Sequence, residues 1–252
     1  VLDNKNIDKK LNDLGLSQDI YENLKDILKL TQGLILISGP TGSGKTTTLY
    51  SILKELNSDD KKIITVEDPI EYKIDSINQV PINNKVGLSF ELVLKNILRQ
   101  DPDIIFIGEI RDKFSLDIAL QASLTGHLVL ASIHASSSVE TITRLIDLKA
   151  DPFLISTTLK AVMAQRLVLA HCKSCENGCK ECNFTKFYDR TSIAEILKID
   201  EQISSLIFNK ASFNELKEYL KNINFKTMLD DGKQKVKDGL TTLEEVYKVV
   251  NF

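Results

Sequence analysis

The chain has 252 residues, of which 42% are hydrophobic and 27% are charged, a composition typical of a soluble globular protein with one large domain or two smaller ones. Its formal net charge of −3 disfavours a protein that wraps nucleic acid, because such proteins usually carry a basic footprint, so we expect no direct nucleic-acid partner. No apolar run reaches the roughly 20 residues of a membrane-spanning helix, and the N-terminal residues do not have the apolar core of a signal peptide.

Apolar patterns of strand and helix type alternate along the first two thirds of the chain. The predicted strands are 34–38, 63–67, 104–107, 128–133 and 166–170. The predicted helices are 17–31, one that begins within 44–46, one that Ser89 caps, 114–124, 138–148 and 153–165. The segment 74–82 alternates loosely and indicates a hairpin. This alternation predicts an α/β fold with a mainly parallel sheet whose two faces are covered.

The character of the sequence changes in the last third. Ser212-x-x-Glu215 and Thr242-x-x-Glu245 have the spacing of helix capping boxes, and Gly239 is suited to ending a helix. Because the chain opens at Val1 without a methionine, we interpret its start as the remnant of a missing N-terminal domain. The predicted organisation is a linker and helix over 1–32, an α/β core over 33–170, a cysteine segment over 171–185 and a small helical bundle over 186–252.

A glycine-rich motif joins the first predicted strand to the helix that follows it. It reads Gly39-Pro40-Thr41-Gly42-Ser43-Gly44-Lys45-Thr46 and matches the pattern of a P-loop. Glycines let the backbone turn so that successive N–H groups point at phosphate oxygens, assisted by the start of the helix. Lys45 is placed to reach the β- and γ-phosphates and the Thr46 hydroxyl to bind Mg²⁺, and we add Thr47 to the nucleotide-binding residues. The motif predicts a site for ATP or GTP.

Acidic residues follow two of the predicted strands. Glu109 comes after the apolar strand 104–107 and Gly108, at the position of a catalytic base or water-orienting group of a P-loop site; the alternative is an acid that faces solvent. Glu67 ends the strand 63–67 and Glu71 lies shortly after it, at the edge where α/β proteins bind ligands. Both are candidates for the negative charge near the metal that Gly108 does not supply. Acids before a proline are also common in turns.

His134 follows the strand 128–133 at the same edge of the sheet. A polar group there is placed to sense the γ-phosphate, although a lone histidine is more often structural. His127, which begins this strand, is a weaker candidate.

These motifs, taken in order, resemble those of the secretion-superfamily traffic ATPases, which drive type II secretion, type IV pilus assembly and DNA-uptake pseudopili. The resemblance rests on segments 39–48, 66–71, 99–103, 108–112, 121–134, 163–167, 231–232 and 239–246. It implies a RecA-like P-loop core, Mg²⁺-dependent ATP hydrolysis and a homo-hexamer. It assigns catalysis to Glu109, places Glu67 and Glu71 around the metal and the attacking water, and places His134 near the γ-phosphate. It also implies a cytoplasmic motor peripheral to the inner membrane, which touches the membrane only through platform and adaptor proteins.

The four cysteines form two closely spaced pairs, Cys172-x-x-Cys175 and Cys179-x-x-Cys182. Two such pairs suit Zn²⁺ bound by four thiolates. Assembly-type members of the resembled family carry this kind of site, but with a long insertion between the pairs where this chain has three residues. We therefore predict a zinc site, with reduced cysteines of a degenerated site as the alternative, and His171 as a substitute ligand.

Phosphoryl transfer requires positive charge opposite the leaving group, often from an arginine of a neighbour. The arginines of this chain are Arg99, Arg111, Arg144, Arg166 and Arg190. The resembled family also draws arginines from an N-terminal domain, and we expect that supply to be missing here. The alternatives are therefore a retraction or conjugation ATPase of the same superfamily, which the cysteine pairs and the acidic charge disfavour, and a nucleotide-binding scaffold with little turnover.

Overall fold

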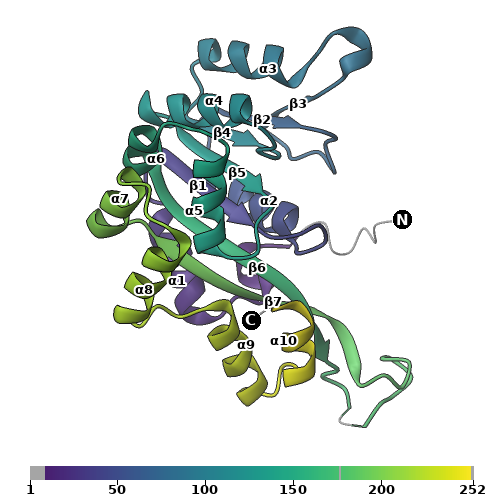
Figure 1. The fold of residues 1–252 in the computed structure, drawn as a ribbon. Coiled ribbons are helices and arrows are strands. Elements are labelled where there is room, and N and C mark those ends of the chain that lie inside the picture. The colour runs from purple at the N-terminus through teal and green to yellow at the C-terminus, as the bar shows by residue number, and fades with distance from the viewer. Residues whose placement is uncertain (1–8, 176, 251–252) are drawn as a thin grey trace.

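The computed structural model describes residues 9–175 and 177–250, which form a seven-stranded sheet with helices on both faces (Figure 1). The predicted structure of residues 1–8 lies outside the described part. The strand order is β3-β2-β4-β5-β1-β6-β7, and every pair is parallel except β6 and β7. The strands are β1 (Gly33–Ser38), β2 (Ile63–Glu67), β3 (Asn78–Pro81), β4 (Ile104–Ile107), β5 (Leu128–Ile133), β6 (Leu159–His171) and β7 (Phe187–Lys198). The predicted α/β class and the mainly parallel sheet are confirmed.

The helices divide between the two faces of the sheet. The described helices are η2 (Leu11–Leu14), α1 (Gln18–Ile27), α2 (Lys45–Leu56), η3 (Asn84–Val86), α3 (Phe90–Ile97), η4 (Leu98–Gln100), α4 (Lys113–Leu124), α5 (Ser138–Asp147), α6 (Pro152–Thr158), α7 (Glu201–Phe208), α8 (Phe213–Asn222), α9 (Met228–Lys237) and α10 (Leu243–Val249). Because successive side chains of a strand point to opposite faces, Leu34 and Leu36 pack with α3 to α8, whereas Ile35 and Ile37 pack with α1 and α2. None of these helices is long and apolar enough to cross a membrane.

Three predicted elements differ in the structure. The segment 74–82 forms no hairpin: β3 lies parallel to β2. The helix predicted over 153–165 ends at Thr158, and β6 begins at the next residue, because the apolar run that follows pairs with β1 in the middle of the sheet. The helical bundle predicted over 186–252 begins later than expected, because β7 occupies Phe187–Lys198 and pairs antiparallel with β6.

The predicted capping boxes have different outcomes. Ser212 and Glu215 form a complete box at the start of α8, and Ser89 caps α3 as predicted. At Thr242 only half of the box forms: the hydroxyl accepts the Glu245 amide, but the Glu245 carboxylate accepts the Leu169 amide instead of returning to Thr242. Glu245 therefore joins α10 to β6.

Buried charges attach β7 to the elements around it. Glu195 accepts the Ser138 amide at 2.7 Å and the Met228 amide at 2.9 Å, and so caps the first turns of both α5 and α9. On α9, Asp231 accepts the Ala194 amide at 2.9 Å and lies 3.4 Å from the Lys235 ammonium. These bonds hold the C-terminal helices against the sheet.

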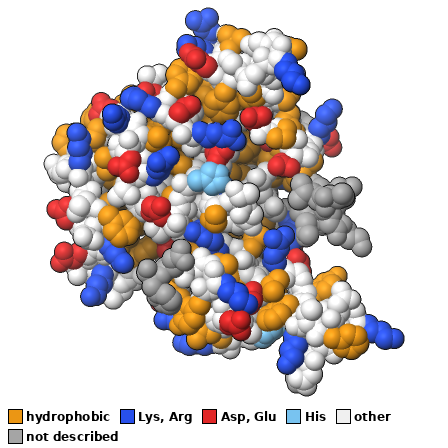
Figure 2. Space-filling view, turned by 45° about the vertical axis from the view of Figure 1, so that its right-hand side comes forward, with side chains coloured by type: hydrophobic (Ala, Val, Ile, Leu, Met, Phe, Trp, Pro, Cys, Tyr) orange, Lys and Arg blue, Asp and Glu red, His pale blue; other side chains and the backbone are white. Residues whose placement is uncertain are grey.

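The long β6–β7 ladder projects beyond the other strands and carries the cysteine segment at its far end, next to α9 and α10 (Figure 1). Thr241 donates to the Leu169 carbonyl at 2.7 Å, and the His171 amide donates to the Leu240 carbonyl at 2.9 Å. The turn between α9 and α10 is therefore bonded to β6. On the face drawn in Figure 2, acidic and basic side chains are interspersed.

Candidate nucleotide and metal sites

The glycine-rich loop lies between β1 and α2, as predicted. Gly44 is the N-cap of α2 with a φ of 88°, in the left-handed region that a glycine adopts without strain. Gly39 is packed closely: a Cβ there would lie 2.7 Å from the Gln165 carbonyl oxygen. The start of α2 presents free amides for an anion, with Thr46 and Thr47 in its first turn.

Lys45 is folded back over the loop. Its Nζ donates to the carbonyl oxygens of Gly39 at 2.8 Å and Pro40 at 3.0 Å. Burial lowers the pKa of Lys45 from its ordinary value; Glu109 opposes this shift and Arg166 adds to it. Two cations at one loop indicate a place for negative charge, and a bound phosphate offers Lys45 a stronger partner than the two carbonyls.

Buried polar atoms without a partner surround the loop. Within the described residues these are Ser38 Oγ, Ser43 Oγ and Gln165 Oε1. A buried polar atom is costly unless it has a hydrogen-bond partner. Together with the close packing at Gly39, these orphaned atoms fit a loop that closes around a polar ligand such as the phosphates of ATP.

Glu109 is held on both sides beyond the end of β4. His134 Nε2 lies 2.5 Å from its Oε1, and Arg111 Nε lies 2.5 Å from its Oε2. Arg111 also lies 3.8 Å from Asp68. Because β4 and β5 are neighbours, their carboxyl ends bring Glu109 and His134 together, as the sequence predicts for residues at one edge of a parallel sheet.

Glu67 lies inside the molecule instead of on an open surface. Its side chain is 3% exposed, and its carboxylate accepts hydrogen bonds from Tyr50, from Thr65 at 2.5 Å and from Gln79 at 3.1 Å. Glu71, by contrast, is exposed, and its amide donates to the Tyr50 hydroxyl at 3.3 Å. The predicted acidic pair is therefore separated into one hydrogen-bonded carboxylate in the core and one exposed carboxylate at the surface.

A cavity of about 420 Å³ adjoins Glu109. Its lining consists of Glu109, Ile110, Arg111, Ile133, His134 and Arg144. It lies at the carboxyl ends of β4 and β5, where open α/β sheets bind ligands.

The sequence marked Arg166 only as one of five candidate arginines and assigned no contact to Gln165 or Arg166 on β6. Gln165 Nε2 donates to the Ser43 carbonyl at 2.8 Å. The Arg166 guanidinium is buried and donates to the carbonyls of Gln165 at 2.9 Å and Ser136 at 3.0 Å. These two residues connect the P-loop with the loop that carries His134. The available signal was a polar pair inside the otherwise apolar run 161–170 of β6.

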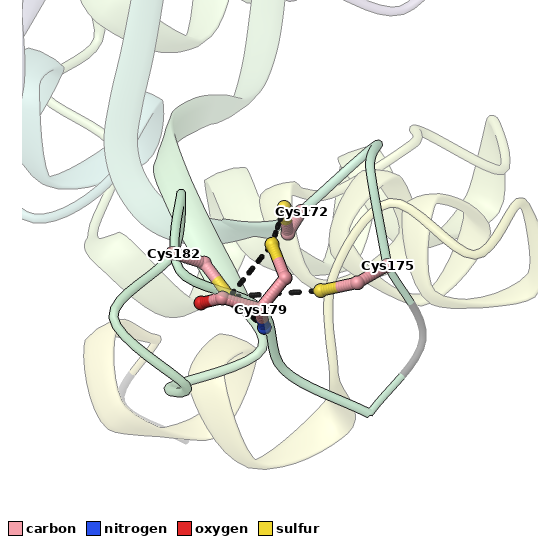
Figure 3. A group of neighbouring side chains, drawn as sticks. All are labelled: Cys172, Cys175, Cys179 and Cys182. Atoms are coloured by element: carbon pink, nitrogen blue, oxygen red, sulfur yellow. Dashed lines mark hydrogen bonds between the residues drawn. The ribbon is translucent and has the colours of Figure 1, made fainter.

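The four cysteines lie together, as predicted (Figure 3). Their sulfur atoms all lie within 4.8 Å of one another, with distances of 3.9 Å for Cys172–Cys179, 3.6 Å for Cys175–Cys182 and 3.8 Å for Cys179–Cys182. A tetrahedral zinc with bonds of about 2.3 Å requires sulfur separations of about 3.8 Å. The Cys179 amide donates to the Cys182 sulfur at 3.2 Å and lowers the pKa of that thiol.

The short link between the two cysteine pairs is accommodated by Gly178. Its φ is 101°, and a Cβ there would lie 2.9 Å from the Phe184 carbonyl oxygen. His171 does not join the cluster: its Nδ1 donates to the Gly239 carbonyl at 2.9 Å, and its ring packs against Phe187. The described donor set therefore consists of the four sulfurs alone, which fits Zn²⁺.

The mainly parallel sheet, the glycine-rich loop at the end of the inner strand β1 and the acidic residue after β4, on the other side of β5, define the P-loop class of α/β folds. Comparison with known proteins narrows this class. Residues 1–248 match the family described as "Type II/IV secretion system protein", and the chain belongs to that family.

Individual relatives agree with this assignment. The chain is 42% identical to the "Type II secretion system protein HxcR" of Pseudomonas aeruginosa over 95% of its own length and 53% of the relative. It is 41% identical to the "Type II secretion system ATPase E" of Vibrio cholerae, over 95% of this chain and 52% of that one. It is 39% identical to the "Type IV pilus assembly ATPase PilB" of Thermus thermophilus, over 94% of this chain and 30% of that one.

A solved structure has the same fold. The pilus retraction motor PilT, crystallised with ADP, has a TM-score of 0.79 and 30% identity, over 97% of this chain and 67% of PilT. The chain spans about half the length of the type II secretion relatives that it matches.

Proposed function

We propose that this chain is the ATP-hydrolysing part of a motor that powers type II secretion, type IV pilus assembly or DNA-uptake pseudopilus assembly. The observation that carries the proposal is the placement of Glu109, held by His134 and Arg111 at the sheet edge that also bears the P-loop. Membership of the type II/IV secretion family and relatives named as ATPases support it.

In this proposal a residue of the chain performs each chemical task of ATP hydrolysis. The P-loop amides and Lys45 bind the phosphates, and the Thr46 hydroxyl holds Mg²⁺, which stabilises negative charge on the phosphates when bound. Glu109 orients a water for in-line attack on the γ-phosphorus, and His134 fixes the Glu109 carboxylate. Glu71 is free to contribute charge near the metal, whereas Glu67 acts from inside the core through its bonds to Tyr50 and Gln79.

The decisive experiment compares Glu109→Gln with Glu91→Gln, an exposed glutamate of α3 outside the site. In E109Q we expect ATP binding to persist while turnover falls by a factor of about 10² to 10⁴, the usual contribution of a positioned acid–base group. E91Q should match the wild type. Equal turnover in E109Q and the wild type would place the base elsewhere. ATP binding without turnover in the wild type itself would favour a nucleotide-binding scaffold.

We further propose that the chain works as a homo-hexamer on the cytoplasmic side of the inner membrane, where platform and adaptor proteins receive its motion. An assembly or secretion role is preferred over pilus retraction because the relatives named for secretion and assembly are more similar to this chain than the retraction motor is. Gene neighbourhood distinguishes secretion, pilus assembly and DNA uptake.

We also propose that Cys172, Cys175, Cys179 and Cys182 bind one structural Zn²⁺, which their sulfur separations fit. Elemental analysis of the purified chain should find about one zinc per chain. Cys175→Ser should lose it, whereas Ser174→Ala, an exposed neighbour, should retain it. A metal-free protein with four freely titrating thiols would refute the site.

A further inference from the structure

Arg144 differs in its surroundings from the other arginines near the site. Arg111 is paired with Glu109, and the Arg166 guanidinium is buried against two backbone carbonyls. Arg144, near the end of α5, is exposed but lines the same cavity as Glu109 and His134. Within the described part of the chain, no carboxylate lies within ion-pair distance of its guanidinium.

The charges around the cavity do not cancel. Arg111 neutralises Glu109, which leaves the Arg144 guanidinium as excess positive charge. The other lining residues are Ile110, Ile133 and His134, none of which carries negative charge. A guanidinium presents a planar fork of N–H donors that matches the oxygen geometry of phosphate, so a cavity of this kind favours a small tetrahedral anion.

The size and position of the cavity restrict the identity of the anion. Its volume of about 420 Å³ leaves room for a phosphate ion with several waters of about 30 Å³ each. None of its lining residues belongs to the P-loop, so the cavity is separate from the nucleotide loop. Glu109 is the group shared between the cavity and the proposed point of water attack.

We propose that this cavity binds the inorganic phosphate released by ATP hydrolysis, with Arg144 as its main ligand and Arg111 as a second. The proposal rests on the ATPase function proposed above. In hydrolysis the water oxygen bonds to the γ-phosphorus while the bond to the bridging oxygen of ADP breaks, and the proton of the water goes to the products. The departing phosphate enters a space where Arg144 neutralises its charge and Glu109 accepts its remaining O–H.

A binding experiment tests this without requiring turnover. The protein is saturated with MgADP and titrated calorimetrically with inorganic phosphate at constant ionic strength. Phosphate should bind to the wild type, and Arg144→Gln should weaken that binding about 10- to 100-fold, the value of a charge-assisted hydrogen bond to phosphate. Arg190→Gln, which removes an exposed arginine of β7 outside the cavity, should change it less than about twofold. Arg144→Lys, which keeps the charge but loses the fork, should be intermediate.

The outcomes separate this proposal from the ATPase function. Failure to bind MgADP contradicts the nucleotide site itself, whereas MgADP binding without phosphate binding contradicts the phosphate cavity alone. Equal phosphate affinity in the wild type and R144Q also overturns the proposal. If R144Q leaves phosphate binding unchanged but weakens self-association in sedimentation, the cavity belongs to an acidic side chain of a second copy, and the proposal is again wrong.

Discussion

His134 Nε2 lies 2.5 Å from Glu109 Oε1, although 24 residues separate the two along the chain and each follows a different strand. The contact exists because β4 and β5 are adjacent and parallel, so that their carboxyl ends meet. Arg111 holds the second oxygen of the same carboxylate. The carboxylate is therefore oriented from two sides before any ligand arrives, which is the preorganisation that a water-orienting group requires.

Removing the imidazole tests this orientation directly. In His134→Ala we expect turnover to fall about 10- to 100-fold while nucleotide affinity is retained, because the carboxylate keeps its charge but loses its alignment. His127→Ala is the matched control: His127 precedes β5 at the opposite edge of the sheet and contacts the Ala122 carbonyl. Steady-state ATPase assays and nucleotide titrations measure both. Equal losses in the two variants would contradict a specific role for His134.

A second prediction concerns the buried Glu67. Tyr50→Phe removes one hydrogen-bond donor from a carboxylate that is 3% exposed, so the free energy of unfolding should fall by about 1–3 kcal/mol. Tyr219→Phe is the control, because its hydroxyl bonds to Asp200 at the surface, and its loss should cost less than about 1 kcal/mol. Denaturant unfolding measures both. Unchanged stability with reduced turnover in Y50F would instead assign Glu67 to the catalytic machinery.

A third prediction concerns Lys235, whose side chain is 3% exposed and lies 3.4 Å from the Asp231 carboxylate. Its Nζ also donates to the carbonyls of Gly15, at 2.7 Å, and Ser192. Lys235→Met leaves the acid and these carbonyls without their partner, and should lower the free energy of unfolding by about 3–5 kcal/mol. Lys237→Met, at an exposed position of the same helix, should cost less than about 0.5 kcal/mol.

Lys235 also determines the direction in which the stability of the protein changes with pH. Burial lowers the pKa of Lys235 from its ordinary 10.5, against the opposing effect of Asp231. Between the folded pKa and 10.5 the unfolded chain holds more protons, so stability from this group rises with pH. The stability advantage of the wild type over K235M should therefore grow as the pH is raised toward about 10. An advantage that shrinks over this range would contradict the shift.

The last prediction concerns the contact between α9 and α10. A Cβ at Gly232 would lie 2.6 Å from Val246 Cγ1, so Gly232→Ala should destabilise the protein by about 1–3 kcal/mol despite the better helix propensity of alanine. Val246→Ala removes the clashing methyl groups. The double variant should therefore be no less stable than V246A alone. Additive losses in this double-mutant cycle would show that the two residues do not interact.

The parts of the fold that local sequence predicts are those with unambiguous patterns. The strands 63–67, 104–107 and 128–133 agree with the structure because each is a short, mainly apolar run bounded by turn residues. The segment after Thr158 was predicted as helix because an apolar run of that length has no decisive period. Its strand conformation depends on β1 and β7, which are distant in sequence.

The candidate site likewise contains some contacts that the sequence predicts and others that it does not. The sequence predicts that Glu109 and His134 lie at the same edge of the sheet, because each residue comes after a predicted strand of a parallel sheet. The burial of Glu67 could not be predicted in this way, because it depends on contacts with Tyr50 of α2 and Gln79 of the edge strand β3. The role of Gln165 as a partner of Ser43 likewise requires knowing that β6 lies beside β1.

The geometry of β6 has a mechanical consequence. Gln165 contacts the P-loop, and six residues later the same strand ends at His171, adjacent to the cysteine cluster. At about 3.3 Å per residue these points are about 20 Å apart on one antiparallel ribbon. A small rotation of this ribbon about Gln165 would therefore produce a larger displacement at the cysteine cluster than at the nucleotide loop.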